Sequence, residues 1–270
     1  MSGKTVYAIA SGKGGVGKTT ATVNLGAAIA GTDERVAVVD TDLGMANLAG
    51  FVSLRPEATT LHEVLAGEAD VEEATYSLAD DLVAVPSGTT LDEYARTSPE
   101  ALAAVVDRLR EEFDYVLLDV GAGVSHETVL PLGVADAVIL VSTPEPAAVH
   151  DTKKTVELTD RTGGGVAGLV LNRVHDDGVS SAAIADRLGV ELLAEIPEDP
   201  AVRDSVFAGT PLVVHEPGAP AALAYRRLAA ALVGAEPPRE EERDDEPGET
   251  VAASPDDVSS AITEAESDTE

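Results

Sequence analysis

The chain has 270 residues, of which 44% are hydrophobic and only 3% aromatic, with no Trp and no Cys. This is enough apolar material for one large domain, and a core of Val, Leu, Ile and Ala is typical of a buried parallel sheet covered by helices. The lack of Cys excludes disulfides, thiolate zinc sites and Cys-ligated clusters. We find neither a signal peptide nor an apolar run long enough to span a bilayer, so we expect a cytoplasmic protein.

The charge balance is strongly acidic, with 18 Lys and Arg against 49 Asp and Glu and a formal net charge of −31. Such a chain repels itself at low salt, whereas molar salt shortens the screening length to about 3 Å. A surface rich in carboxylates and poor in Lys suits a cytoplasm filled with salt. We therefore expect the source to be a halophile.

Short runs rich in Val, Ile, Leu and Ala alternate with helical patterns along the chain. The alternation predicts an α/β fold: a mostly parallel, twisted sheet of about seven strands with helices on both faces. Strands are expected at 5–10, 36–40, 82–86, 115–119, 137–142, 166–172 and 192–197. Helices are expected at 19–30, 99–112, 147–161, 180–188 and 219–233.

The composition changes at Glu236: from this residue onward the chain holds 14 acidic and two basic residues and almost no large apolar side chains. A segment of this kind cannot bury enough surface to fold alone. We therefore expect one folded domain at 1–234 and an acidic, disordered tail at 235–270. A docking segment for a partner is the alternative interpretation of the tail.

A glycine-rich segment follows the first predicted strand and precedes the first predicted helix. It comprises Gly12, Lys13, Gly14, Gly15, Val16, Gly17, Lys18, Thr19 and Thr20. The spacing is that of a P-loop, in which glycines let backbone N–H groups point at a phosphate and the helix N-terminus adds to the attraction. Lys18 would then bridge the β- and γ-phosphates, and the Thr19 hydroxyl would bind Mg²⁺. A glycine-rich turn with an unrelated lysine is the alternative interpretation.

Two other predicted strands end in carboxylates. One ends at Asp119, and another ends at Asp40, with Asp42 two residues further on. Ligands of open α/β sheets bind at the carboxyl ends of the strands, so Asp119 is expected at the metal. Alternation along an extended chain places Asp40 and Asp42 on the same side. Asp40 would then lie near Mg²⁺ and Thr19, and Asp42 would orient the attacking water. The alternative is that one of the pair caps the next helix.

Together these motifs resemble the MinD/ParA family of deviant Walker A ATPases, and MinD more than ParA. The resemblance spans residues 4–234. It is carried by KGGVGKTT (13–20), DTDLGMANL (40–48), TLHEVLAGEADVEEA (60–74), DYVLLD (114–119), LNR (171–173) and IPEDPAVRDSVFAGTPLV (196–213). It implies a slow, partner-stimulated hydrolysis of ATP to ADP and phosphate. It also implies an ATP-dependent homodimer that helps position division, motility or chemosensory machinery.

The resemblance also assigns roles at the phosphates. It makes Lys13 the signature lysine, which reaches the ATP of the partner subunit across a two-fold interface, with an ordinary loop residue as the alternative. It makes Asp42 the hydrolytic aspartate and Asp40 its neighbour at the metal. Lys13, Lys18 and Asp42 are thus the expected catalytic residues, and Thr19, Asp40 and Asp119 the expected metal ligands.

For the base, the resemblance assigns Asn172 to the adenine edge, with a simple turn former as the alternative. The loop at 196–199, including Pro197 and Glu198, would line the base. The chain departs from the family at 120–123, where a small polar residue and Pro usually follow the metal-site aspartate. It also lacks a basic, amphipathic C-terminal helix, so the resemblance does not extend to direct membrane binding, and peripheral association with a membrane through a partner is the alternative to a purely cytoplasmic location.

Two other functions stay open. A ParA-like DNA partition ATPase needs a basic face, for which the candidates are Lys153, Lys154, Arg226 and Arg227. The large negative charge makes DNA an unfavourable partner. A P-loop enzyme that activates a small molecule needs a carboxylate or amine pocket, which the sequence does not reveal.

Overall fold

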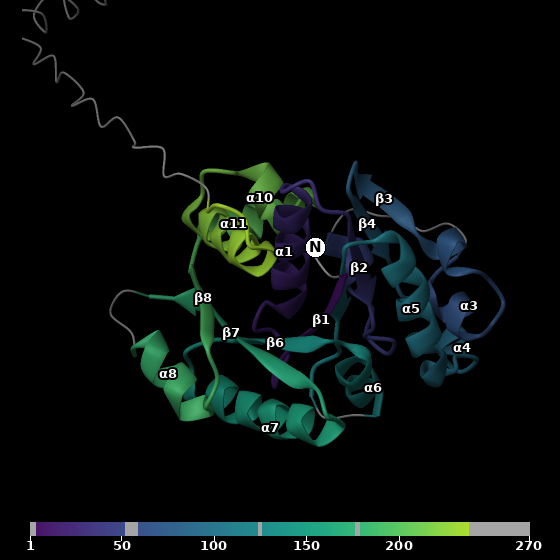
Figure 1. The fold of residues 1–270 in the computed structure, drawn as a ribbon, viewed down its shortest axis with the longest axis horizontal. Coiled ribbons are helices and arrows are strands. Elements are labelled where there is room, and N and C mark those ends of the chain that lie inside the picture. Colours follow the sequence, from purple (N-terminus) through teal and green to yellow (C-terminus); the bar gives the residue numbers. More distant parts are fainter. Residues whose placement is uncertain (1–3, 52–58, 124–125, 176–178, 238–270) are drawn as a thin grey trace, which may run out of the picture. The chain divides into compact units, whose positions relative to one another are not determined.

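The computed structural model describes residues 4–51, 59–123, 126–175 and 179–237 (Figure 1). Its sheet has eight strands in the order β3-β4-β2-β5-β1-β6-β7-β8, all paired in parallel except β3 with β4. The strands are β1 (Thr5–Ala10), β2 (Val36–Asp40), β3 (Tyr76–Ala79), β4 (Leu82–Val85), β5 (Tyr115–Asp119), β6 (Ala137–Ser142), β7 (Gly165–Val174) and β8 (Leu192–Pro197). The acidic tail predicted at 235–270 lies outside the described residues from 238 onward.

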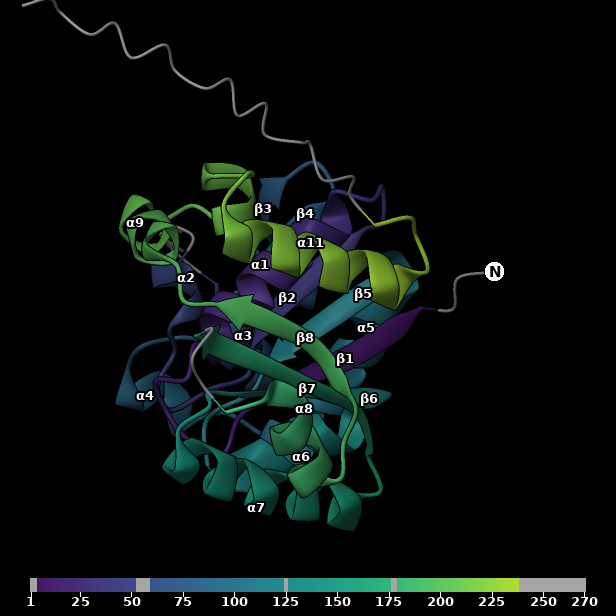
Figure 2. The same cartoon turned by 90° about the vertical axis from the view of Figure 1, so that its left-hand side faces the viewer.

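Helices cover both faces of the sheet, with α1 and α11 on one side and α7 on the other (Figure 2). The longer helices are α1 (Lys18–Ala30), α5 (Leu102–Glu112), α6 (His126–Val134), α7 (Pro146–Thr162), α8 (Ser181–Leu188), α9 (Pro200–Ala208) and α11 (Pro220–Val233). The short ones are α2 (Leu48–Phe51), α3 (Leu61–Leu65), α4 (Leu91–Tyr94) and α10 (Leu212–His215), with 3₁₀ turns η1 (Val71–Ala74) and η2 (Pro99–Ala101). Within these ranges no helix is both long and apolar enough to cross a bilayer.

The central strands are buried on both faces, which explains their nearly continuous apolar sequences. In β2, Val36 and Val38 pack in the core beneath α1 and α11. Ala37 and Val39 pack in the opposite core, with α5. All five residues of β2 and all five of β5 are buried. The cores therefore hold β2 and β5 rigidly, and the polar residue at the end of each strand is placed with them.

The predicted α/β class is confirmed, but the expected count of about seven strands is one too low. The missing strand is β3, a four-residue edge strand that pairs antiparallel with β4 through an irregular register between Ser77 and Ala79. Its residues alternate between half-buried and exposed, so it has no apolar run of the kind that marks the inner strands.

The strand order places the site at the centre of the sheet. The strands that follow β1 in the chain lie on one side of it, as far as β5, and the strands from β6 onward lie on its other side. Ligands of open α/β sheets bind where the strand order reverses in this way. The loop after β1 and the ends of β2 and β5 meet there. Asp40 and Asp119 are direct neighbours in the β2–β5 register, and Asp119 is paired with Ile9 of β1.

One carboxylate ties α9 to α11. Both helices begin with Pro, and Asp199 accepts the N–H of the next residue in each, from Ala201 at 2.9 Å and from Ala221 at 3.2 Å. We expect Asp199→Ala to lower the free energy of unfolding by about 1–3 kcal/mol, measured by urea denaturation. Asp204→Ala, the same change at an exposed position of α9, should stay within about 0.5 kcal/mol of wild type. Equal losses in the two variants would contradict the double-cap assignment.

Candidate functional site

The glycine-rich segment forms a loop between β1 and α1, as the sequence predicts. Gly15 and Gly17 have φ values of 81° and 89°, a left-handed conformation that favours glycine. Gly17 is the residue before α1, and no acidic side chain lies in the first turn of the helix. The positive end of α1 therefore faces the loop, and no acidic side chain of the helix's own first turn offsets it.

The start of this loop packs against the backbone of α7. A Cβ added at Gly12 would lie 2.1 Å from the backbone carbon of Asp151, so only glycine fits there. Lys13 is exposed. A hydrogen bond from Thr143, aided by the positive charges of Arg173 and Lys13, lowers the pKa of Glu145. Lys13 thus lies on the surface near an acidic side chain that precedes α7.

The other lysine of the loop is turned inward. Lys18 Nζ lies 2.7 Å from Asp119 Oδ1, and the two side chains are only 9% and 1% exposed. Thr19 Oγ1 donates to Asp119 Oδ2 at 2.7 Å, and Thr22 Oγ1 donates to Asp119 Oδ1 at 2.9 Å. One buried carboxylate therefore holds the lysine and the hydroxyl that were predicted to bind phosphate and magnesium. Thr22 was not predicted, although its spacing of three from Thr19 places both on one helix face.

Asp40 is completely buried and organises the chain that follows β2. Its Oδ1 accepts the N–H of Asp42 at 3.1 Å, and its Oδ2 accepts those of Asn47 and Leu48 at 2.9 and 3.0 Å. Burial and the neighbouring Asp119 raise the pKa of Asp40 to about 7, while the three N–H donors oppose this shift. Asp40 lies beside the predicted metal ligands, but its oxygens bind the loop, and its role as a metal ligand stays a prediction.

Asp42 is half-buried on the same loop. Its Oδ1 accepts the N–H of Met45 at 3.1 Å. A Cβ added at Gly121 would lie 3.2 Å from Asp42 Cγ, so the loop after Asp119 approaches Asp42 closely. The glycine at 121, where the sequence departs from the family pattern that it resembles, thus leaves room for the Asp42 carboxylate. The hydrolytic role of Asp42 stays a prediction.

The residues assigned to the base come from the ends of β7 and β8. Asn172 is 8% exposed, and its Nδ2 donates to the Val16 carbonyl of the P-loop at 2.8 Å. Pro197 ends β8. The backbone N–H of Glu198 donates to Val174 O at 3.1 Å. The Glu198 carboxylate lies 2.6 Å from His175 Nε2, and the side chains of Glu198 and His175 are each more than half exposed. Asn172 therefore reaches the P-loop, a contact that the sequence did not predict.

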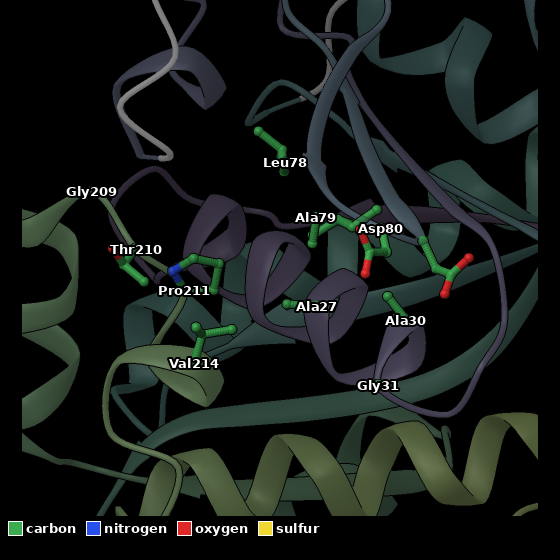
Figure 3. Close-up of a pocket in the computed structure, with 12 residues that line it drawn as sticks. Ala27, Ala30, Gly31, Leu78, Ala79, Asp80, Gly209, Thr210, Pro211 and Val214 are labelled. Atoms are coloured by element: carbon green, nitrogen blue, oxygen red, sulfur yellow. The ribbon is translucent and has the colours of Figure 1, made fainter.

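A cavity of about 430 Å³ opens at the other end of α1 (Figure 3). Apolar and small residues line much of it, among them Ala27, Ala30, Pro211 and Val214. Because a helix rises about 1.5 Å per residue, Ala30 lies about 18 Å along α1 from the phosphate-binding end. None of the predicted site residues lines this cavity. The P-loop site is thus a separate region of the molecule.

The P-loop residues fit a magnesium nucleotide. Threonine hydroxyl and carboxylate oxygens are the hard ligands that Mg²⁺ takes, and Thr19 and Asp119 already meet. Lys18 begins α1, where its ammonium group can move from Asp119 to a phosphate. A loop with two left-handed glycines, at the switch point of a parallel sheet, supplies backbone N–H donors. Fold and site together define a P-loop nucleotide-binding protein.

Comparison with known proteins identifies the family. Residues 7–212 match the family model described as the CobQ/CobB/MinD/ParA nucleotide binding domain, and the chain belongs to this family. An uncharacterized ATP-binding protein of Methanocaldococcus jannaschii is 39% identical over 230 residues, or 84% of this chain and 87% of the relative.

Two solved structures from Pyrococcus are similar over nearly their whole length. The cell division ATPase MinD of Pyrococcus furiosus has a TM-score of 0.81 and 36% identity, covering 85% of this chain and 98% of that one. The septum site-determining protein MinD of Pyrococcus horikoshii, in complex with Mg-ADP, has a TM-score of 0.80 and 33% identity, covering 84% and 95%. The predicted family, its MinD-like character, the P-loop fold, and ATP and Mg²⁺ as ligands are confirmed.

The Lys18–Asp119 pair should stabilise the nucleotide-free protein. Lys18→Met would leave Asp119 and Asp40 buried side by side without a cation, and we expect it to cost about 3–5 kcal/mol of unfolding free energy. Lys154→Met is the matched control, because Lys154 pairs with Asp151 at a similar distance of 2.8 Å on the surface, and it should cost less than about 1 kcal/mol.

The measurement is urea denaturation of both variants in concentrated KCl without nucleotide. A loss in Lys18→Met no larger than that in Lys154→Met would show that the buried pair contributes little to stability.

Proposed function

We propose that this chain is a slow cytoplasmic ATPase that forms a dimer with Mg-ATP, resets on hydrolysis, and so helps position a cellular structure. The observation that carries the proposal is the opposite placement of two lysines of one loop. Lys18 is buried on Asp119, at the site of its own nucleotide. Lys13 is exposed at the start of the loop, where a second subunit can approach.

The charge at the loop explains why such a dimer would depend on ATP. Two facing loops that each present Lys13 repel each other, and the added negative charge of a γ-phosphate on each side turns this repulsion into attraction. The pKa of Glu145 is lowered mainly by a hydrogen bond from Thr143, and that of Asp151 mainly by one from Lys154. The charge of Lys13 adds a smaller lowering to both, so both carboxylates lie near it. These carboxylates offer Lys13 a weaker alternative contact in the monomer.

Hydrolysis would reset the switch through the loop that carries Asp42. Asp40 fixes this loop through three backbone N–H groups, and Gly121 borders the Asp42 carboxylate. A half-buried carboxylate beside the predicted metal ligands is suited to orient a water molecule, and we assign this role to Asp42. A partner that contacts the loop would alter the position of Asp42 and thereby the rate of hydrolysis.

A protein partner is part of the proposal. A solved MinC:MinD cell division complex of Aquifex aeolicus contains a chain 28% identical to this one, with a TM-score of 0.77, covering 87% of this chain and 98% of that one. By this similarity we propose that the chain also acts through a bound protein. Division, motility and chemosensory machinery remain the candidate structures to be positioned.

The arrangement of the basic residues argues against DNA as the partner. Lys153 and Lys154 lie on α7, whereas Arg226 and Arg227 lie on α11, and these helices cover opposite faces of the sheet (Figure 2). Lys154 is paired with Asp151, and Arg226 donates to the Val213 carbonyl at 3.0 Å. The four residues therefore do not form the single basic face that phosphate contacts require.

The dimer switch is tested by light scattering with size-exclusion chromatography in concentrated KCl. We expect wild type to be monomeric with Mg-ADP and dimeric with Mg-ATP. Lys13→Ala should remain monomeric with both, because the contact to the partner's phosphates is lost. Asp42→Ala should hold the dimer with Mg-ATP for longer than wild type, because hydrolysis no longer resets it.

The control is Lys4→Ala, which removes an exposed lysine just before β1, at the end of the strand away from the P-loop. It should dimerise as wild type does. Mg-ATP binding without dimers in any of the four proteins would exclude the switch while retaining the nucleotide site.

A further inference from the structure

Asn172 forms a long-range contact with the P-loop that is separate from any contact with a base. Its Nδ2 donates to the Val16 carbonyl at 2.8 Å, across 156 positions of the sequence. Its Oδ1 accepts the N–H of Arg173 at 3.0 Å. Because a carbonyl only accepts and a backbone N–H only donates, the two contacts fix the orientation of the amide. At 8% exposure, the side chain is buried between β7 and the loop.

The backbone around Asn172 is shaped for this contact. Arg173 has a φ of 55°, a left-handed conformation that is uncommon outside glycine. The β7–β8 register shifts at the same place, between Asn172 and Val174. A strained residue at the end of a strand persists only where its surroundings stabilise it. Here the hydrogen bond from the Arg173 N–H to Asn172 Oδ1 does so, and it also fixes the amide.

On the loop side, the contact determines the direction of one peptide group. In a planar trans peptide the carbonyl and the following N–H point in opposite directions. Since Asn172 holds the Val16 carbonyl, the Gly17 N–H points away from Asn172. Gly17 must be a glycine for this approach, because its φ is 89° and an added Cβ would lie 2.2 Å from Asn172 Nδ2.

We propose that Asn172 is a positioning residue for the phosphate cradle: it orients the Val16–Gly17 peptide so that the Gly17 N–H donates to the nucleotide phosphates. The proposal deepens the nucleotide site described above and rests on it. If it is right, Asn172 affects the affinity of the loop for every phosphate ligand, whether or not the ligand carries a base. A residue that only reads adenine would affect nucleotides alone.

The test therefore uses Mg-tripolyphosphate, which has no base, beside Mg-ATP. We expect Asn172→Ala and the similarly shaped Asn172→Leu to weaken the binding of both ligands about tenfold, measured by isothermal titration calorimetry in concentrated KCl. Both variants lack the donor to Val16, while Leu keeps the volume of the side chain. Thermal unfolding of each variant establishes that the protein is folded at the temperature of the titration.

Asn24→Ala is the matched control. Asn24 is a buried asparagine of α1 that is 2% exposed, donates to Thr20 O at 2.9 Å and accepts the Val213 N–H at 3.1 Å. Its loss should lower Tm and leave tripolyphosphate affinity within about twofold of wild type, because its bond to Thr20 is to a carbonyl within α1 and neither bond touches the Val16–Gly17 peptide.

Three results would overturn the proposal. Asn172 variants that bind tripolyphosphate as wild type does would show that the side chain acts on the base or not at all. An equal loss in Asn24→Ala would make the effect one of general stability. A wild type that binds Mg-ATP but not tripolyphosphate would show that the cradle is not formed before the base binds. Failure of wild type to bind Mg-ATP would instead overturn the nucleotide site itself.

Discussion

The buried pair of Lys18 and Asp119 is the interaction on which the rest of the site depends. Two carboxylates, Asp119 and Asp40, end adjacent strands in a region that excludes water. Desolvation by burial and the repulsion from Asp119 raise the pKa of Asp40, and a cation beside Asp119 offsets part of this cost. Lys18 supplies that cation in the free protein. We propose that Lys18 moves to a phosphate when a magnesium nucleotide binds, and that Asp119 would then lie beside the metal instead of the lysine.

The loops around this pair depend on the same rigid strand ends. Asp40 binds the backbone of the loop that carries Asp42. Gly12 lets the P-loop pack against α7, and Asn172 of β7 donates a hydrogen bond to the P-loop. The predicted phosphate site is therefore assembled from strands in both halves of the sheet. In the dimer that we propose, the exposed Lys13 would connect this site to the surface of the protein.

The sequence was sufficient for the inner strands and the P-loop because local pattern determines both. Five of the seven predicted strands have the predicted bounds, since each is a mostly apolar run between polar residues. Of these, β2 and β5 are buried throughout. The edge strand β3 lacks such a run and was missed. The short helices near the site were missed as well, because their ends depend on hydrogen bonds such as those that Asp40 accepts from Asn47 and Leu48.

The sequence predicted the contacts of some site residues but not those of others. The meeting of Lys18, Thr19 and Asp119 follows from motif and topology, and the structure brings them together. The hydrogen bonds that Asp40 accepts at the start of α2 match the alternative that one aspartate of the pair caps the next helix, but the pattern did not tell which one. The contact of Asn172 with Val16 does not follow from the sequence, because it depends on the path of a loop that no periodicity describes. The glycine at 121 was a departure from the family pattern, and the close approach to Asp42 gives its physical reason.

The most direct measurement of the central claim is a crystal structure of the chain with Mg²⁺ and a non-hydrolysable ATP analogue, grown in concentrated KCl. The account predicts that Lys18 Nζ has left Asp119 and contacts the β- and γ-phosphates, with Mg²⁺ bound by Thr19 on the Asp119 side. A complex in which Lys18 still pairs with Asp119 while the nucleotide is bound would contradict it.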